Sequence, residues 1–208
     1  MSLTKREVIP LLVAATLAGA WFLRPGVPRA VEPSSGRTII AFGDSLVAGH
    51  GATSGHDFVS VLSTRLRVPI LNQGRNGDTT RTALDRLNQD VLSRNPKIVI
   101  VLLGGNDFLR GVPVEDTFAH LGKIVERIRG RGAAVILVGV SVGLFSDPYG
   151  HEYEALARRT GAGLVPDVLD DILGRGDLMA DSIHPNDRGY RLMAERVEPI
   201  LRELLQVD

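Results

Sequence analysis

No cysteine occurs among the 208 residues of the chain. This absence excludes disulfide bonds, thiolate metal sites and a cysteine nucleophile. It leaves the compartment open, because a domain of this size buries enough core to fold without covalent cross-links. The length itself predicts one well-buried domain, with little chain left for a second.

Net charge is absent as well, since 24 lysines and arginines balance 24 aspartates and glutamates. A balanced chain offers no excess of positive charge for a phosphate backbone, so we expect no nucleic-acid partner. The sequence also lacks internal repeats and low-complexity tracts.

The first 23 residues differ in character from the rest of the chain. Lys5 and Arg6 precede a mainly apolar stretch from Val8 to Leu23, a pattern typical of an export signal or a short membrane anchor. No clean cleavage site with small residues follows Leu23, so the pattern favours an uncleaved anchor over a removed signal. We therefore expect a cell-envelope protein that is anchored in the membrane and faces the periplasm or the exterior, or is secreted if the segment is cleaved.

The chain thus divides into three parts. These are an N-terminal anchor or signal segment at residues 1–23, a Pro-rich linker at residues 24–36 and one folded domain at residues 37–208. The alternative is that the first segment is an ordinary helix of the fold. The Pro-rich stretch disfavours that alternative, because it detaches the segment from the domain.

Short apolar runs alternate with helical patterns along the domain. The strand candidates are Thr38–Phe42, Val68–Leu71, Ile98–Leu103, Ala134–Val140 and Gly163–Val165. Apolar residues at helical spacing lie between or after them, namely Leu84, Leu87 and Val91, then Phe118, Leu121, Val125 and Ile128, and finally Met193, Val197, Ile200 and Leu204. This alternation predicts an α/β fold in which helices cover both faces of a parallel sheet. In such folds, functional residues gather beyond the carboxyl ends of the strands.

The segment Gly43-Asp44-Ser45-Leu46 closes the first of these runs. A tight turn there can expose the Ser45 hydroxyl, which becomes a nucleophile when a base removes its proton. The alternatives are a plain turn or a helix cap. Val47 stands where an α/β-hydrolase elbow has its second glycine, and the segment lacks both the Lys-Ser/Thr pair and the glycine spacing of phosphate loops.

The segment Asp181-Ser182-Ile183-His184-Pro185 supplies a carboxylate and an imidazole three residues apart. With Ser45 they complete the parts of a hydrolytic triad in the order Ser, Asp, His. The alternative is that Asp181 or Ser182 caps the last helix and that His184 is merely exposed. We interpret the remaining histidines as structural, namely His50, His56, His120 and His151.

Two glycine-containing turns also fall at predicted strand ends. Gly104-Gly105-Asn106-Asp107 follows the most apolar run, where the Asn106 amide could donate to a developing oxyanion. Asn76-Gly77-Asp78-Thr79 could donate in the same way from the Gly77 N–H. Each segment could instead be a simple turn before a helix.

Taken jointly, the four segments resemble those of the SGNH, or GDSL, hydrolase superfamily, in an order and spacing that cover nearly all of residues 37–208. The chain is most similar to the bacterial thioesterase I/lysophospholipase/arylesterase branch. The closer match rests on Val47-Ala48-Gly49, Gly77-Asp78-Thr79 and Leu109-Arg110-Gly111. Gly74 is a second candidate for the glycine of the second segment, but Asp78 and Thr79 favour Gly77.

The resemblance implies a three-layer α/β/α sandwich of the flavodoxin-like type, with a five-stranded parallel sheet. It implies that Ser45 is the nucleophile, His184 the base and Asp181 the group that orients it. The oxyanion hole would comprise the N–H groups of Ser45 and Gly77 and the Asn106 side chain. The expected enzyme is a monomeric serine esterase that acts on acyl esters or thioesters and needs no metal and no organic cofactor.

The resemblance also implies that the loop after Asn106 borders the acyl chain through Phe108, Leu109 and Val112. The alternative is a plain connection whose apolar residues pack into the core. Two other functions remain open at this point. One is a carbohydrate O-deacetylase or an acyltransferase of the same superfamily, and the other is a non-catalytic flavodoxin-like module whose glycine loops bind anions.

Overall fold

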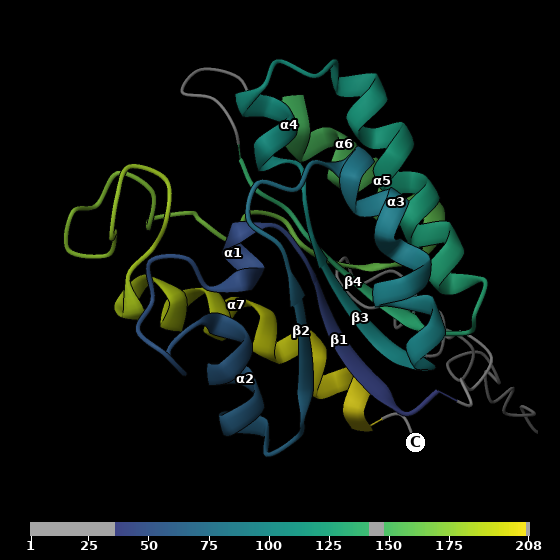
Figure 1. The fold of residues 1–208 in the computed structure, drawn as a ribbon, viewed down its shortest axis with the longest axis horizontal. Coiled ribbons are helices and arrows are strands. Elements are labelled where there is room, and N and C mark those ends of the chain that lie inside the picture. The colour runs from purple at the N-terminus through teal and green to yellow at the C-terminus, as the bar shows by residue number, and fades with distance from the viewer. Residues whose placement is uncertain (1–35, 142–147, 207–208) are drawn as a thin grey trace, which may run out of the picture.

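The computed structural model describes residues 36–141 and 148–206 of the chain. Five parallel strands form one sheet in the order β2-β1-β3-β4-β5 (Figure 1). The strands are β1 (Thr38–Gly43), β2 (Ile70–Gly74), β3 (Pro96–Leu102), β4 (Ala134–Val138) and β5 (Gly163–Val165). The predicted five-stranded parallel sheet is therefore confirmed. Strand β2 begins at Ile70 and ends at Gly74, both later than predicted. It begins later because the Val68 N–H still donates to Ser63 O at the end of the preceding helix.

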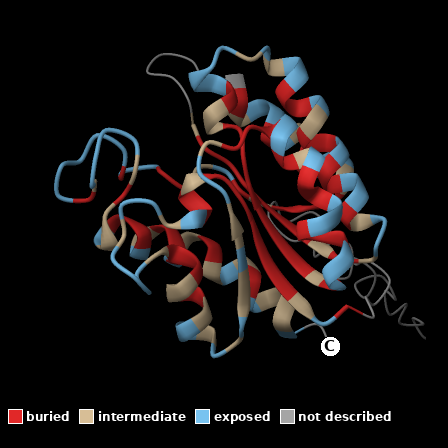
Figure 2. Cartoon of the chain, viewed as in Figure 1, coloured by how far each residue is buried: buried red, intermediate tan, exposed pale blue. Residues whose placement is uncertain are grey.

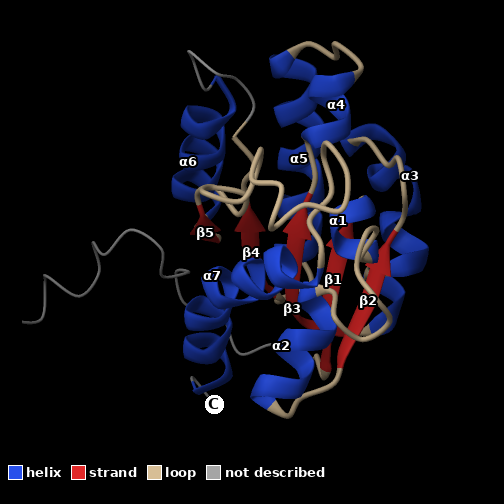
Figure 3. Cartoon of the chain, turned by 90° about the vertical axis from the view of Figure 1, so that its left-hand side faces the viewer, coloured by secondary structure: helices blue, strands red, loops and turns tan. Residues whose placement is uncertain are grey.

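Helices cover both faces of this sheet (Figure 3). They are α1 (Ser45–Ala48), α2 (Phe58–Leu66), α3 (Thr80–Asp90), α4 (Gly105–Leu109), α5 (Val114–Arg129), α6 (Pro148–Thr160) and α7 (Asp187–Gln206), with a short 3₁₀ turn, η2 (Leu92–Arg94). Helices α1, α2 and α7 pack on one face, and α3, α5 and α6 pack on the other. The predicted three-layer α/β/α arrangement is present.

The alternation of side chains along the strands produces two separate cores. On β1, Ile39 and Ala41 point to the core shared with α2 and α7, whereas Ile40 and Phe42 point to the core shared with α3, α5 and α6. Figure 2 shows the buried strands between the two helical layers. All four apolar positions predicted for the helix before β4 are buried, namely Phe118, Leu121, Val125 and Ile128.

The predicted N-terminal segment at residues 1–23 lies outside the described residues, as does the linker at residues 24–36 apart from Gly36. Among the helices that the structure describes, none has the length and apolar character needed to cross a bilayer.

Strands β1 and β3 are neighbours at the centre of the sheet, with Gly43 paired to Leu102. The chain leaves β1 toward one helical layer and leaves β3 toward the other. Such a switch point opens a crevice beyond the carboxyl ends of the two strands, which is where ligands bind in folds of this type. Ser45 and Asn106 follow these two strands directly.

Candidate active site

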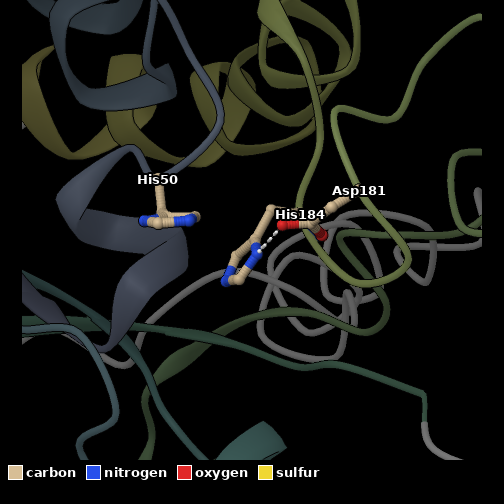
Figure 4. A group of neighbouring side chains, drawn as sticks. All are labelled: His50, Asp181 and His184. Atoms are coloured by element: carbon tan, nitrogen blue, oxygen red, sulfur yellow. Dashed lines mark hydrogen bonds and ion pairs between the residues drawn. The ribbon is translucent and has the colours of Figure 1, made fainter.

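Ser45, His184 and Asp181 form a continuous hydrogen-bonded chain. The Oγ atom of Ser45 lies 2.9 Å from Nε2 of His184, although 139 residues separate the two in sequence. Nδ1 of the same ring lies 2.8 Å from Oδ2 of Asp181, a contact visible in Figure 4. The fold thus brings a hydroxyl, an imidazole and a carboxylate together from two distant segments.

Asp181 is held as an ionised acceptor. Its Oδ1 atom accepts hydrogen bonds from the backbone N–H groups of Ile183 at 2.9 Å and His184 at 2.7 Å. These bonds, with the one from the His184 ring, lower the pKa of Asp181 to about 2. An ionised carboxylate can only accept, so Nδ1 of His184 carries the proton and Nε2 presents its lone pair to Ser45.

The alternative role of this segment as a helix cap is not realised. Helix α7 begins at Asp187, and the Asn186 side chain accepts from the N–H groups of Arg188 and Gly189. Asp181 is therefore available to the imidazole. The segment is also fixed from the other side, because Thr53 donates two hydrogen bonds of 2.7 Å to the Asp187 carboxylate.

Asp44, directly before Ser45, is a buried carboxyl at the start of α1. It accepts from the backbone N–H of Leu46 at 3.0 Å. Burial, together with the nearby charges of Asp78 and Asp107, raises the pKa of Asp44 to about 7. The site therefore contains one carboxyl that ionises easily, Asp181, and one that resists ionisation.

One expected oxyanion donor, Asn106, lines the same pocket as Ser45, and another, Gly77, is next to Asp78, which Asn106 contacts. Asn106 lies in the first turn of α4, where its Nδ2 atom donates to Asp78 O at 3.0 Å and lies 3.4 Å from Asp44 Oδ2. The first contact has ordinary hydrogen-bond geometry, whereas the second is long and weak. One Nδ2 proton of Asn106 thus anchors the side chain and the other is nearly free. Within the described part of the chain, the N–H groups of Ser45 and Gly77 donate to no other protein atom.

The two candidate glycines, Gly74 and Gly77, are required by the structure for different reasons. Gly74 ends β2 against helix α1, where a Cβ atom would lie 2.1 Å from Ala48 N. Gly77 lies in the following turn with a φ of 79°, and its carbonyl accepts from the Arg110 side chain at 2.8 Å. Gly77 is therefore the glycine of the turn next to Asp78, which Asn106 contacts, and its choice over Gly74 as a donor stays a prediction.

A mostly apolar pocket of about 180 Å³ opens beside Ser45 and His184. Its apolar lining comes from five parts of the fold and consists of Leu46, Phe108, Leu109, Val140, Leu169, Leu173 and Ile183. Phe108, Leu109, Leu173 and Ile183 are the large apolar side chains that are exposed in the described residues. Their convergence at one mouth indicates a binding surface for an apolar group.

Two of the three residues expected at the acyl chain reach this pocket, and Val112 does not. The chain turns after α4, where the Val112 N–H donates back to Asp107 O at 2.9 Å, and Val112 does not line the pocket. Leu169, Leu173 and Ile183 line the pocket in its place. No local sequence signal could have identified them, because these residues lie in irregular loops without periodicity.

His50, which the sequence analysis interpreted as structural, lies beside the triad. Its ring centre is 4.4 Å from that of His184, and Figure 4 shows the two rings side by side. The backbone carbonyl of His50 accepts from the Tyr190 hydroxyl at 2.7 Å, which fixes this loop to α7. His50 was missed because the fold, not the sequence spacing, brings it to His184.

Comparisons with known proteins agree with this geometry. The model of the GDSL-like Lipase/Acylhydrolase family matches residues 41–192. The chain is 29% identical over 185 residues to Esterase TesA of Pseudomonas aeruginosa, covering 84% of this chain and 92% of the relative. It is 26% identical over 179 residues to Thioesterase 1/protease 1/lysophospholipase L1 of Escherichia coli K12, covering 82% of this chain and 86% of the relative.

The fold agrees as well. The crystal structure of TesA superposes with a TM-score of 0.76 at 30% sequence identity, covering 81% of this chain and 99% of that one. These similarities confirm the superfamily and the branch that the four sequence segments indicated. The chain belongs to the GDSL-like lipase/acylhydrolase family, and it is a carboxylic ester hydrolase of that family.

Proposed function

We propose that the chain hydrolyses medium-chain acyl esters or thioesters with Ser45 as nucleophile, His184 as general base and Asp181 as the orienting carboxylate. The observation that carries this proposal is the unbroken set of contacts from Ser45 Oγ to Asp181, at 2.9 and 2.8 Å. This geometry aligns the imidazole lone pair with the hydroxyl proton that must be removed.

In the first step, Nε2 of His184 takes the Ser45 proton while Oγ forms a bond to the acyl carbon, and the carbonyl electron pair moves to oxygen. The N–H groups of Ser45 and Gly77 and the second Nδ2 proton of Asn106 stabilise that oxyanion. The imidazolium then protonates the leaving alcohol or thiol as its bond to the acyl carbon breaks. Water repeats the sequence on the acyl-enzyme and releases the acid.

The apolar pocket supports the choice of acyl group. Leu109, Leu173 and Ile183 surround its mouth, and each methylene that leaves water there contributes about 0.8 kcal/mol. A chain of several carbons therefore gains binding energy that an acetyl group lacks. The Escherichia coli relative is named as both a thioesterase and a lysophospholipase, which supports an acyl thioester or ester as the substrate class.

A series of p-nitrophenyl esters from acetyl to palmitoyl tests this proposal. We expect kcat/KM to rise severalfold with added carbons until the pocket is full, and to be highest for medium chains. Ser45→Ala is the control for background hydrolysis. Highest activity on acetyl esters would replace this proposal with a carbohydrate O-deacetylase, and transfer of the acyl group to an alcohol in place of water would indicate an acyltransferase.

We further propose that residues 1–23 hold the domain at the outer side of the cytoplasmic membrane and that residues 24–36 act as the linker. The support is the basic start and the apolar stretch from Val8 to Leu23. Cell fractionation with N-terminal sequencing tests it. A full-length soluble pool in the cytoplasm would overturn the proposal, and a mature N-terminus after Leu23 would replace the anchor with a cleaved signal.

A further inference from the structure

A second imidazole faces the triad from the loop after α1. The rings of His50 and His184 are 4.4 Å apart, centre to centre, and tilted by 52°. Asp181 lies on the other side of His184 in Figure 4. One ligand atom from each of the three side chains lies within 4.8 Å of the other two. Two imidazoles and a carboxylate are a ligand set that zinc accepts.

We propose that His50, His184 and Asp181 form a binding site for a divalent transition-metal ion of the zinc type, and that occupancy of this site inhibits the enzyme. The inhibitory effect rests on the proposed function of His184. The metal binding itself does not, because it depends only on the three ligands.

The three side chains need little movement to take up a metal ion. Zinc bonds of about 2.0–2.2 Å place tetrahedral ligand atoms about 3.4 Å apart. His50, whose ligand atom lies within 4.8 Å of the other two, must therefore approach by at most about 1.4 Å. Asp181 Oδ2, now 2.8 Å from His184 Nδ1, must draw back by roughly 0.6 Å. The His50 ring is exposed, and its contact with the Asn76 amide is long, at 3.4 Å. The His50 backbone is held by Ser45 O and by the Tyr190 hydroxyl. The ring can therefore turn toward His184 without movement of the loop.

A metal ion at this place changes the protonation of the imidazole. Nδ1 of His184 is the nitrogen beside Asp181, so an ion shared with the carboxylate binds at Nδ1 and displaces its proton. The neutral ring keeps one proton, which passes through solvent to Nε2. In that tautomer Nε2 is a donor and cannot accept the proton of Ser45. Metal binding thereby removes the base while the fold stays intact.

The ligand chemistry also predicts which ions act. Imidazole nitrogen favours zinc, copper and nickel, whereas magnesium and calcium favour sites built from oxygen atoms. With two nitrogen ligands and one carboxylate, the site should respond to zinc and ignore magnesium. The metal is an inhibitor here and takes no part in the reaction.

Titration calorimetry on the Ser45→Ala protein measures zinc binding without catalysis. We expect one zinc ion per chain, and no such binding after a further His50→Asn or Asp181→Ala substitution. In the chain with Ser45 intact, zinc should abolish ester hydrolysis, a chelator should restore it, and an equal concentration of magnesium should have no effect.

His50→Asn should leave hydrolysis without zinc unchanged and raise the zinc concentration for half-inhibition at least about tenfold. His56→Asn, which alters another exposed histidine, is the matched control and should change neither quantity. Equal zinc sensitivity in His50→Asn and the unaltered chain would overturn the proposal, as would undiminished zinc binding in either double variant. If zinc binds as expected but no ester is hydrolysed, the proposed function fails and the metal site stands.

Discussion

The guanidinium of Arg86 lies 4.3 Å from the centre of the Phe42 ring, buried between the sheet and helix α3. Its Nε donates to Asp78 and its two terminal nitrogens donate to Asp90 and to Gly43 O, each of these two at 2.9 Å. One buried cation therefore connects the end of β1, just before Ser45, to the turn after β2 that carries an expected oxyanion donor.

Replacing Arg86 with alanine is expected to lower the free energy of unfolding by about 3–5 kcal/mol. The substitution removes the buried cation beside Asp78 and leaves Asp90 with only its longer, 3.4 Å contact to the exposed Arg75 side chain. Urea denaturation measures the loss. Arg81→Ala on the same helix is the control, because its ion pair with Asp85 is exposed and its removal should change stability by no more than about 0.5 kcal/mol. Equal effects of the two substitutions would contradict this account of Arg86.

Asp44→Asn is expected to alter how stability depends on pH. The pKa of Asp44 is about 7 in the folded protein, against 3.8 as the ordinary value, so the folded chain binds this proton more tightly. Ionisation of Asp44 is therefore less favourable in the folded chain than in the unfolded chain. As the pH rises from about 4 to about 7, this carboxyl lowers the free energy of unfolding by an amount on the order of 4 kcal/mol. The amide of the variant cannot ionise, but its oxygen can still accept from the Leu46 N–H.

Unfolding free energies of both proteins at several pH values across this window test the prediction. The variant should gain stability relative to the unaltered chain as the pH rises, and the difference should level off above about pH 7. A difference that does not change with pH would show that Asp44 is ionised throughout the window in the folded state.

The activity should fall as the solution is acidified, with Asp181 still ionised. The pKa of Asp181 is about 2, so its carboxylate persists far below neutral pH. The mechanism requires a neutral imidazole, because a protonated ring has no lone pair that could take the Ser45 proton. Asp181→Asn should reduce kcat by on the order of 10³–10⁴ because the amide favours the wrong imidazole tautomer. A kcat/KM that stays constant from pH 8 down to pH 4 would be inconsistent with histidine as the base.

Leu109→Ala is expected to flatten the preference for longer acyl chains. Leu109 is 59% exposed at the pocket mouth, so its truncation should cost little stability while removing apolar area from the substrate side. The ratio of kcat/KM for octanoyl and acetyl esters should fall severalfold. Val112→Ala is the matched control, because Val112 does not line the pocket. If this ratio of kcat/KM falls further in Val112→Ala than in Leu109→Ala, the acyl site lies on the other side of the loop.

The sheet, the helical layers and the two segments that meet at Ser45 and His184 could be predicted because their signals are local. Strand runs such as Thr38–Phe42 and the helical spacing from Phe118 to Ile128 each report which face is buried. The turn at Gly77 and the segment from Asp181 to His184 likewise carry their chemistry within a few residues.

The pocket lining, the burial of Arg86 and the place of His50 could not be predicted, because they depend on contacts between distant segments. Leu173 lies in an irregular loop without periodicity, so nothing local indicates that it meets Leu109 at the pocket. Arg86 has the pattern of an exposed helical charge, and only the packing of α3 on the sheet buries it. His50 is a further case, since its neighbour His184 is more than a hundred residues away.

The central claim is that Ser45 is the nucleophile, and labelling with a fluorophosphonate tests it most directly. Phosphorus is attacked by the activated hydroxyl with loss of fluoride, which leaves a stable adduct on the nucleophile. Peptide mass spectrometry should find one phosphonyl group per chain, on Ser45, with hydrolysis lost in the same proportion. Ser45→Ala should show no label, no hydrolysis and an unchanged unfolding temperature. A label on Ser141 or Ser182, the serines that lie beside the pocket and Asp181, or continued hydrolysis by Ser45→Ala, would contradict the account.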